Sequence, residues 1–423
     1  MDYQPRVVDQ LLSELVSGLP AVAVEGAKGV GKTASAGRLA ASVLELDNEA
    51  LRTNVAAQPS LVTRYAPPTL IDEWQLVPTV WDVVRREVDR DRVPGRFIMT
   101  GSASPADGAR THSGAGRIVR LVMRPMTLPE RGVSTPTVSF TDLLTGAKPD
   151  VEGSTAIDLV DYTAEILASG LPGVRQDAIR WRARQLDSYI DEALDIEIPA
   201  LGVNVRRPQA LRAWLAAYAS ATATTTNYTA ILNAATPGEA DKISKPTAAA
   251  YRALLERIRL LDPLPAWIPS MNSMARLGQA PKHHLVDPAL AAVLLGATQE
   301  SLLDGSVAGP VPRDGTLLGA LFESLAVLTI RVFAEPSGVR VSHLRTNDNE
   351  HEVDVIVETP DHRVLAIEVK LSSAVRRDDV KHLNWLESQI GDRLIGKVLI
   401  NTGAIAHRLP DGTAVVPLAL LGP

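Results

Sequence analysis

The stretch GAKGVGKT, residues 26–33, constrains the fold of this 423-residue chain more than any other feature. It fits the pattern G-x-x-x-x-G-K-[ST], follows the apolar run AVAVE (21–25), and precedes a helical segment. Glycines let the loop turn its backbone N–H groups inward around phosphate oxygens, and the following helix adds the positive end of its dipole. The sequence therefore predicts a strand–loop–helix unit that binds a nucleoside triphosphate.

Each position of this loop has an expected role. Lys32 is expected to reach the β- and γ-phosphates, and Thr33 is expected to bind Mg²⁺. The remaining positions are expected to line the phosphates with their backbone: Gly26, Ala27, Lys28, Gly29, Val30 and Gly31. The expected ligands are therefore ATP and Mg²⁺.

A second motif supplies the catalytic half of such a site. In TLIDE, residues 69–73, an apolar strand ends in two adjacent acids. Asp72 is expected to hold the magnesium ion through water, and Glu73 to polarise the attacking water. The alternative is an exposed strand end with two surface acids. The presence of both motifs in one chain favours the catalytic interpretation.

Two further candidates follow along the chain. The strand RFIMTGSAS, residues 96–104, delivers Thr100 and Ser102 at its C-terminal edge, where open α/β sheets bind ligands. One of these two hydroxyls is expected to sense the γ-phosphate. Arg117 is either an arginine finger, reaching its own or a neighbouring subunit's nucleotide, or an ordinary surface arginine.

The segments around these motifs predict the fold class. Strands and helices alternate up to residue 101, which indicates a doubly wound α/β layer with a parallel sheet. Residues 132–156 are rich in Gly, Pro, Ser and Thr and predict a linker or long loop. Beyond it, segments 227–240 and 247–261 resemble a helix-turn-helix, which either contacts DNA or is only a packing unit. From about residue 315 the pattern predicts a second α/β unit.

The hairpin HEVDVIVETPDHRVLAIEVK, residues 351–370, carries charged residues within two apolar strands. If its turn is centred on Asp361, Asp354 and Glu368 lie opposite each other, with Cβ atoms about 4.5–5.5 Å apart. Two facing carboxylates repel unless a cation lies between them. Lys370 shares the face of Glu368 by the two-residue period of a strand.

This geometry suits a metal site. Asp354 and Glu368 are expected to hold Mg²⁺, while Lys370 orients water or stabilises charge that grows on a phosphate. The alternative is a ladder of acid–lysine salt bridges on a solvent-facing sheet, which is close to energetically neutral.

A resemblance extends over nearly the whole chain. Its motifs are GAKGVGKT, LIDEWQLVPTVWDVVRREVD, FIMTGSAS, SGAGRIVRLVMRPMTLPE, LASGLPGV and WRARQLDSYIDEAL. Together they resemble bacterial and archaeal AAA-type ATPases whose C-terminal region is a domain of unknown function. The resemblance implies a winged-helix middle and a C-terminal domain similar to Holliday-junction resolvases, of the PD-(D/E)xK nuclease type. It also implies that Glu323 is an additional metal-binding acid before the hairpin.

Composition limits the partners. The net charge of −6 argues against a broadly basic surface that coats nucleic acid, although local arginine-rich stretches remain. The chain has no cysteine, which excludes disulfides and thiolate chemistry and suits the cytoplasm. We expect no signal peptide and no membrane partner.

These observations predict three parts: a P-loop AAA-type ATPase domain (1–150), a helical, winged-helix-like domain (151–275), and a nuclease-like, restriction-endonuclease-like α/β domain (276–423). The expected function is an ATPase that couples hydrolysis to engagement or processing of branched or double-stranded DNA. The alternative is an ATP-dependent regulatory switch, in a defence or toxin–antitoxin context, whose C-terminal domain is a non-catalytic interaction module. A homo-oligomer or a protein partner is compatible with both.

Overall fold

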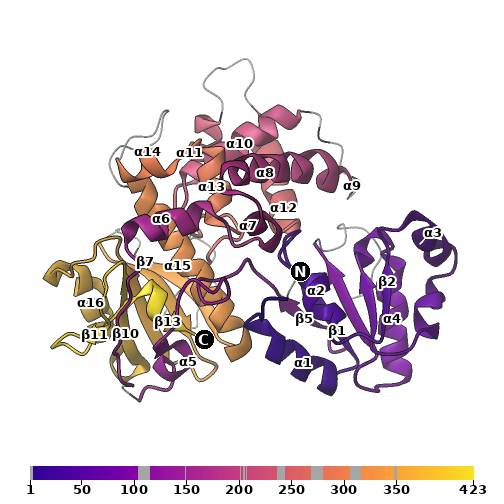
Figure 1. Cartoon of the computed structure of the whole chain (residues 1–423), viewed down its shortest axis with the longest axis horizontal. Coiled ribbons are helices and arrows are strands. Elements are labelled where there is room, and N and C mark those ends of the chain that lie inside the picture. The colour runs from indigo at the N-terminus through magenta and orange to yellow at the C-terminus, as the bar shows by residue number, and fades with distance from the viewer. Residues whose placement is uncertain are drawn as a thin grey trace.

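The structure is a computed structural model that describes residues 3–102, 115–147, 149–200, 202, 205, 207–235, 243–267, 280–304, 316–346 and 350–423. Figure 1 shows an N-terminal sheet on one side, a C-terminal sheet on the other, and a group of helices that spans both.

The N-terminal sheet has five strands in the order β2-β3-β4-β1-β5, and every neighbouring pair is parallel. The strands are β1 (Ala21–Glu25), β2 (Ser42–Glu45), β3 (Thr69–Asp72), β4 (Phe97–Gly101) and β5 (Val119–Val122). This confirms the predicted parallel layer. Because the strands are parallel, their carboxyl ends share one edge, and β4 lies between β1 and β3 at that edge.

Helices cover both faces of this sheet. They are α1 (Val8–Gly18), α2 (Lys32–Gly37), α3 (Glu49–Ala57) and α4 (Thr79–Arg90). In α4, Val80, Val84 and Val88 recur every fourth residue and are buried, so one stripe of the helix faces the sheet. Alternate residues of β1 point to opposite faces: Ala21 and Ala23 pack with α4, while Val22 and Val24 belong to the larger core of the molecule.

The middle of the chain is helical. Its elements are α6 (Leu159–Leu167), α7 (Pro172–Gln176), α8 (Ile179–Glu192), a π-helical turn (Ala193–Glu197), α9 (Ile198–Ala200), α10 (Pro208–Ser220), α11 (Tyr228–Ala234), α12 (Lys245–Arg257), α13 (Pro288–Leu294) and α14 (Gln299–Leu303). The helices predicted near 227–240 and 247–261 are α11 and α12. Ser244 caps α12 by accepting from the N–H of Thr247, as its sequence SKPT indicates.

An antiparallel ribbon follows α12. Leu261 bridges to Leu285, and Leu264 bridges to Lys282. Thr222, after α10, bridges to His283 and so ties the ribbon back to the helices. We call residues 260–267 and 280–286 the ribbon. It extends beyond residue 275, where the sequence placed the end of the middle part.

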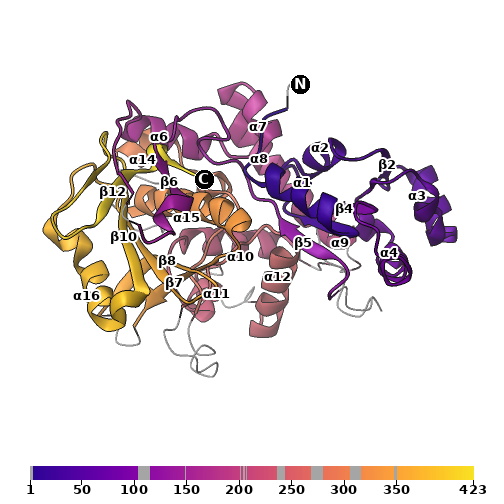
Figure 2. The ribbon, with the colours of Figure 1, turned by 90° about the horizontal axis from the view of Figure 1, so that it is seen from below.

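The C-terminal sheet is mixed, with the order β11-β12-β10-β9-β8-β7. Its strands are β7 (Arg340–Arg345), β8 (Glu352–Glu358), β9 (Val364–Val369), β10 (Leu394–Asn401), β11 (His407–Arg408) and β12 (Ala414–Pro417). α15 (Thr316–Ser337) packs on one face and α16 (Lys381–Ile390) on the other, so both faces are covered. Figure 2 shows α16 at the periphery and α15 toward the centre of the molecule.

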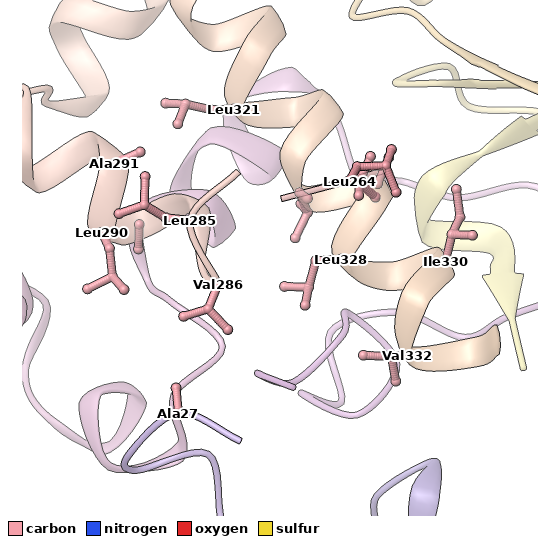
Figure 3. Packing of buried hydrophobic residues seen from close by; sticks show 14 of the residues in the cluster. Ala27, Leu264, Leu285, Val286, Leu290, Ala291, Leu321, Leu328, Ile330 and Val332 are labelled. Carbon is pink, nitrogen blue, oxygen red and sulfur yellow. The ribbon is translucent and has the colours of Figure 1, made fainter. Parts of the chain in front are cut away.

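α15 is the central helix of the protein. Its segment Leu317–Ser337 is long and apolar enough to cross a membrane, with a mean hydropathy of 1.8, but 78% of that window is buried within the structure. Leu328 of α15, Val286 of the ribbon and Ala27 of the phosphate loop belong to one hydrophobic cluster (Figure 3). The three parts therefore share a continuous core.

The Gly- and Pro-rich segment 132–156 packs on the C-terminal sheet. Within it, β6 (Val138–Ser139) pairs in parallel with β13 (Leu421–Gly422). The short helix α5 (Phe140–Leu143) follows, and the rings of Phe140 and Phe333 lie 6.1 Å apart. The segment connects two parts, as predicted, and also completes the C-terminal domain.

Candidate functional site

The phosphate loop joins the end of β1 to the start of α2. Gly29 and Gly31 have φ values of +76° and +102°. Non-glycine residues rarely adopt such values, so the conformation itself selects glycine. At Gly29 no atom lies within 4 Å of an added Cβ, so a side chain would meet no steric clash there. Glycine is therefore favoured at this position by its backbone conformation alone.

Lys32 is held by its own loop. Its Nζ donates to the carbonyl oxygens of Gly26 at 2.8 Å and Ala27 at 2.9 Å. The side chain is buried, and burial lowers the pKa of Lys32 while Glu73 opposes the shift. An ammonium in this position is already at the centre of the loop, where phosphate oxygens would compete with the two carbonyls.

Asp72 brings three predicted residues together. The Thr33 hydroxyl donates to both of its carboxylate oxygens at 3.0 Å. The Thr100 hydroxyl donates to Oδ1 of the same carboxylate. The strand order explains this contact, because β4 places Thr100 between the loop after β1 and Asp72 at the end of β3.

Glu73 follows Asp72 with a left-handed backbone, φ +52°. Its carboxylate accepts from Nε2 of Gln75, and burial raises the pKa of Glu73 while Lys32 opposes the shift. A cavity of about 260 Å³ lies here, lined in part by Lys28, Glu73, Gln75, Ser102 and Glu197. An added Cβ at Gly101 would lie 2.3 Å from Oε1 of Gln75, so glycine is needed for Gln75 to reach Glu73.

The middle part closes over the same loop. The Tyr189 hydroxyl of α8 donates to the carbonyl of Lys28 at 3.1 Å. Glu197 lies 3.8 Å from Nζ of Lys28, and burial raises the pKa of Glu197 while Lys28 opposes the shift. The sequence did not predict a role for either residue, although Tyr189 lies in WRARQLDSYIDEAL, one of the segments that resemble the AAA-type ATPases.

A second cavity of about 530 Å³ lies beside the first turn of α2. Arg6 is fixed at its wall: Nη1 donates to the carbonyl of Val30 at 2.6 Å, Nη2 to that of Arg124 at 2.6 Å, and Nε pairs with Glu130 at 3.0 Å. The lining includes Tyr3, Arg6, Gly31, Ser35, Arg131 and Arg175. It places polar and cationic groups next to the loop, and its lining residues differ from those of the cavity that contains Glu73.

Arg117 lies away from both cavities. It precedes β5, whose first residue Val119 pairs with Val22, whereas the loop begins beyond Glu25. At strand spacing, Arg117 is therefore roughly 16 Å from the edge that carries the loop. Its Nε pairs with Asp89 of α4 at 2.7 Å. This arrangement does not support a role at its own nucleotide, and a role toward a neighbouring subunit stays a prediction.

The C-terminal hairpin has the predicted register. Val355 pairs with Ile367, so the next pair outward is Asp354 with Glu368. Oδ2 of Asp354 accepts from the N–H of Val369 at 2.9 Å. Oε1 of Glu368 accepts from Nζ of Lys370 at 2.6 Å. The hairpin is covered on both sides, so it is not the solvent-facing ladder of the alternative interpretation.

The cation at this hairpin is a lysine that the sequence did not single out. Nζ of Lys282, from the ribbon, lies 2.8 Å from Glu323, 2.8 Å from Glu352 and 2.7 Å from Asp354. Its side chain is 1% exposed. Lys282 precedes His283 and His284, which are both buried and point apart.

The pKa values of three buried acids in this cluster shift in different directions. Burial and the Asp354 charge raise the pKa of Glu323 to about 8, and the same two causes raise the pKa of Glu368 to about 8. Burial alone would also raise the pKa of Asp354, but Lys282 and Lys370 outweigh it and lower that pKa. Of these three acids, Asp354 is therefore the one whose charged form the surroundings stabilise.

As packed, this cluster fits an ammonium and not a divalent cation. Lys282 lies among the oxygens that a metal would use. In the described part of the chain, no group of three His, Cys, Asp or Glu side chains has an arrangement that could hold a metal ion. The metal-binding roles of Glu323, Asp354 and Glu368 stay predictions.

Comparison with known proteins assigns the N-terminal site. Residues 19–131 match the model of an AAA domain family, the region that contains the loop, Asp72, Glu73 and Thr100. The N-terminal part is a P-loop ATPase domain of the AAA type. Residues 159–301 and 318–421 match two families described as domains of unknown function, DUF8612 and DUF4143. The resolvase-like fold of the C-terminal part therefore stays a prediction.

Relatives with similar sequences are themselves uncharacterized. The proteins Rv2008c of Mycobacterium tuberculosis and Mb2031c of Mycobacterium bovis are each 25% identical over 367 residues, which is 84% of this chain and 71% of each relative. Among solved structures, the Walker-type ATPase PABY2304 of Pyrococcus abyssi aligns with 69% of this chain and 99% of its own, with 13% identity and a TM-score of 0.39.

Ion pairs around two partly or fully buried acids, Glu25 and Asp262, join the ATPase domain to the rest of the chain. Glu25, the last residue of β1, pairs with Arg120 at 3.3 Å and with Arg259 after α12. Arg124 pairs with Asp262 at 2.8 Å and with Glu335 of α15 at 3.4 Å. The residue before the phosphate loop is thus connected to the segment that leads into the ribbon.

Proposed function

We propose that this protein hydrolyses ATP and uses the hydrolysis to control how its three parts contact one another. The observation that carries the proposal is the convergence on Asp72 of hydroxyls from Thr33 and Thr100, next to Glu73 and Lys32. This constellation supplies each group that phosphoryl transfer to water requires.

The residues fit ATP with Mg²⁺. Bound Mg²⁺ would neutralise charge on the β- and γ-phosphate oxygens, and Thr33 and Asp72 are the residues that would hold it. Lys32 would exchange its two loop carbonyls for phosphate oxygens. Glu73 would accept the proton of the attacking water, and its raised pKa makes it a stronger base than an exposed glutamate.

We assign the two ends of the nucleotide to the two cavities. The cavity of about 260 Å³ contains Glu73 and would hold the γ-phosphate and the attacking water. The cavity of about 530 Å³ has the size of a small-molecule site and lies beside the first turn of α2, where it would hold the base and ribose.

Phosphate release from ATP with Mg²⁺ tests the proposal directly. The wild-type protein should release phosphate, and Lys32→Ala should abolish nucleotide binding or hydrolysis, because the phosphate charge loses its ammonium. Lys381→Ala, an exposed lysine at the start of α16 in the C-terminal domain, is the control and should retain activity. Wild-type turnover and affinity in a folded Lys32→Ala protein would contradict the proposal.

We further propose that the hydrolysis cycle regulates engagement of DNA. Support comes from the order α10, α11, α12 and ribbon, which is compatible with a winged helix that reads DNA with a helix and a ribbon. ATP turnover measured with linear, forked and four-way DNA tests this, because a DNA-directed machine should be stimulated by at least one of them.

The competing candidate is a regulatory switch with a non-catalytic C-terminal domain. The observation in its favour is Lys282, which fills the predicted metal site with a side chain of the same protein. If ATP is hydrolysed but no DNA changes the rate, the switch is the better account of the protein.

A further inference from the structure

Lys282 belongs to the ribbon of the middle part, yet its ammonium ends among acids of the C-terminal domain. We infer that Lys282 is an internal cation that keeps a latent divalent-cation site closed while the ribbon is docked on the C-terminal domain. The inference rests on the proposed function only in treating the C-terminal cluster as a regulated site, since it requires no hydrolysis of ATP.

The first argument is the match of donors to acceptors. An ammonium has three N–H donors. Nζ of Lys282 contacts three carboxylates, from Glu323 on α15 and from Glu352 and Asp354 on β8, at 2.7–2.8 Å. The ammonium therefore donates hydrogen bonds to Glu323 and Asp354 and forms an ion pair with Glu352. A divalent cation cannot enter this position until the ammonium leaves it.

The second argument is charge. Four carboxylates surround the site, from Glu323, Glu352, Asp354 and Glu368, and three cations pair with them, from Lys282, Lys370 and Arg345, whose Nε lies 3.8 Å from Glu352. With all four acids ionised, the formal sum is −4 + 3 = −1. In addition, Oε2 of Glu368 is buried and has no hydrogen-bond partner among the described residues. With its acids ionised, the cluster therefore has one excess negative charge and one buried oxygen without a donor. A divalent cation would neutralise that charge and displace any protons that Glu323 and Glu368 hold.

The third argument is that Lys282 can leave only with the ribbon. Its backbone N–H and carbonyl bond to Leu264 at 3.0 and 2.9 Å. His283 contacts the carbonyl of Thr226 at 2.6 Å, and the backbone of His343 in β7 donates to Pro265 at 2.9 Å. The ribbon thus connects the helices to the edge of the C-terminal sheet, and undocking it would withdraw the lysine.

The ribbon also has a connection to the nucleotide. Ile258, just before it, lines the cavity that contains Glu73, and Arg259 pairs with Glu25 at the start of the phosphate loop. A change of the loop on ATP binding would act first on these two residues. Nucleotide state, ribbon position and access to the carboxylates are therefore physically linked.

Manganese binding to the full-length chain tests the inference. Titrations followed by calorimetry and by electron paramagnetic resonance are made without nucleotide and in a Thr33→Ala background, which removes the phosphate-loop metal ligand. The background protein should bind no Mn²⁺ at the C-terminal cluster. Lys282→Ala should gain one Mn²⁺ per chain and a Mn²⁺-dependent rise in melting temperature.

Two further variants make the result specific. Lys282→Ala with Asp354→Asn should lose the gained ion. Lys397→Ala removes a buried lysine of β10 in the C-terminal sheet, which contacts Glu387 at 2.7 Å. This control variant should gain no Mn²⁺ ion. If Lys282→Ala does not fold, Lys282→Ala with Glu352→Gln keeps the formal charge at −3 + 2 = −1 and should show the same gain.

Folded Lys282 variants that bind no Mn²⁺ would overturn the inference and make Lys282 a structural ion pair. Equal Mn²⁺ binding with and without Lys282 would also overturn it, because the lysine would then not close the site. Neither outcome depends on ATP turnover, which is measured separately on the protein with Thr33 intact.

Discussion

Asp262 lies between two guanidinium groups from different parts of the chain. Nε of Arg124, after β5, is 2.8 Å from its carboxylate, and Nη2 of Arg331, on α15, is 2.9 Å away. The side chain of Asp262 is 18% exposed. Burial alone would raise the pKa of Asp262, but Arg124 and Arg331 outweigh it and hold that pKa below its usual range. The carboxylate is therefore ionised and compensates two cations that are largely buried.

Replacement of Asp262 by Asn keeps the shape of the side chain and removes its charge. Removing one partner of a buried ion pair costs about 3–5 kcal/mol. Because Asp262 is partly exposed, we expect the lower end of that range, about 3 kcal/mol, in the free energy of unfolding. Urea denaturation followed by tryptophan fluorescence measures this change. Asp89→Asn is the matched control, because its pair with Arg117 is as short, 2.7 Å, but lies on the surface.

The pH dependence provides a second readout. The pKa of Asp262 is lower in the folded protein, so its contribution is present above the unfolded pKa of about 3.9 and is lost as pH falls through the folded value. The difference between wild type and Asp262→Asn should be full at neutral pH and should shrink in acid. If Asp262→Asn and Asp89→Asn change stability equally at neutral pH, the ion pairs of Asp262 do not hold the three parts together.

The remaining predictions concern the two sites. Glu73→Gln should keep ATP bound but slow hydrolysis roughly 10²- to 10⁴-fold, because the amide cannot accept a proton; wild-type turnover would show that Glu73 is not the base. Gly101→Ala should lower turnover with little change in ATP affinity, since the new Cβ displaces Gln75 from Glu73. The control is Gly37→Ala, where no atom lies within 4 Å of the new Cβ, and it should leave turnover unchanged. Burial and Asp354 raise the pKa of Glu368 from 4.5 to about 8. Between these two pH values the folded protein holds a proton on Glu368 that the unfolded chain releases. The free energy of unfolding should therefore fall as pH rises from about 4.5 to about 8. Glu368→Gln should flatten that fall in a denaturation series from pH 5 to pH 8, and an unchanged slope would contradict the shift.

The parts of the fold and site that were predicted correctly depend on contiguous residues. The phosphate loop is one motif in which glycines fix the backbone, so its strand and helix follow from eight residues. The hairpin register follows from its turn, because Asp354 and Glu368 are equally distant from Asp361. The position of Thr100 at the carboxyl edge of the sheet needed only the rule that open α/β sheets bind ligands there; its contact with Asp72 was not predicted.

The parts that were missed depend on contacts between distant segments. Composition alone indicated a loop at 132–156, but β6 within it pairs with β13 at the other end of the chain. The residue type alone could not say whether Arg117 reaches its own nucleotide; the sheet register shows that it lies before β5, away from the edge that carries the loop, while its role toward a neighbouring subunit stays a prediction. Neither fact is encoded in a local pattern.

The same distinction explains the C-terminal cluster. Two opposed carboxylates predicted a shared Mg²⁺ ion, which stays a prediction; in the structure Lys282 contacts Asp354 and Lys370 contacts Glu368. The local pattern could not specify which cation, since Lys282 is 72 residues from Asp354 and belongs to another structural unit. The only sequence signal was a lysine in APKHHLV, a stretch with the apolar residues of a buried strand, where an ammonium needs acidic partners. Pairing each buried charge with an unassigned counter-charge, before invoking a metal, would have connected the two segments.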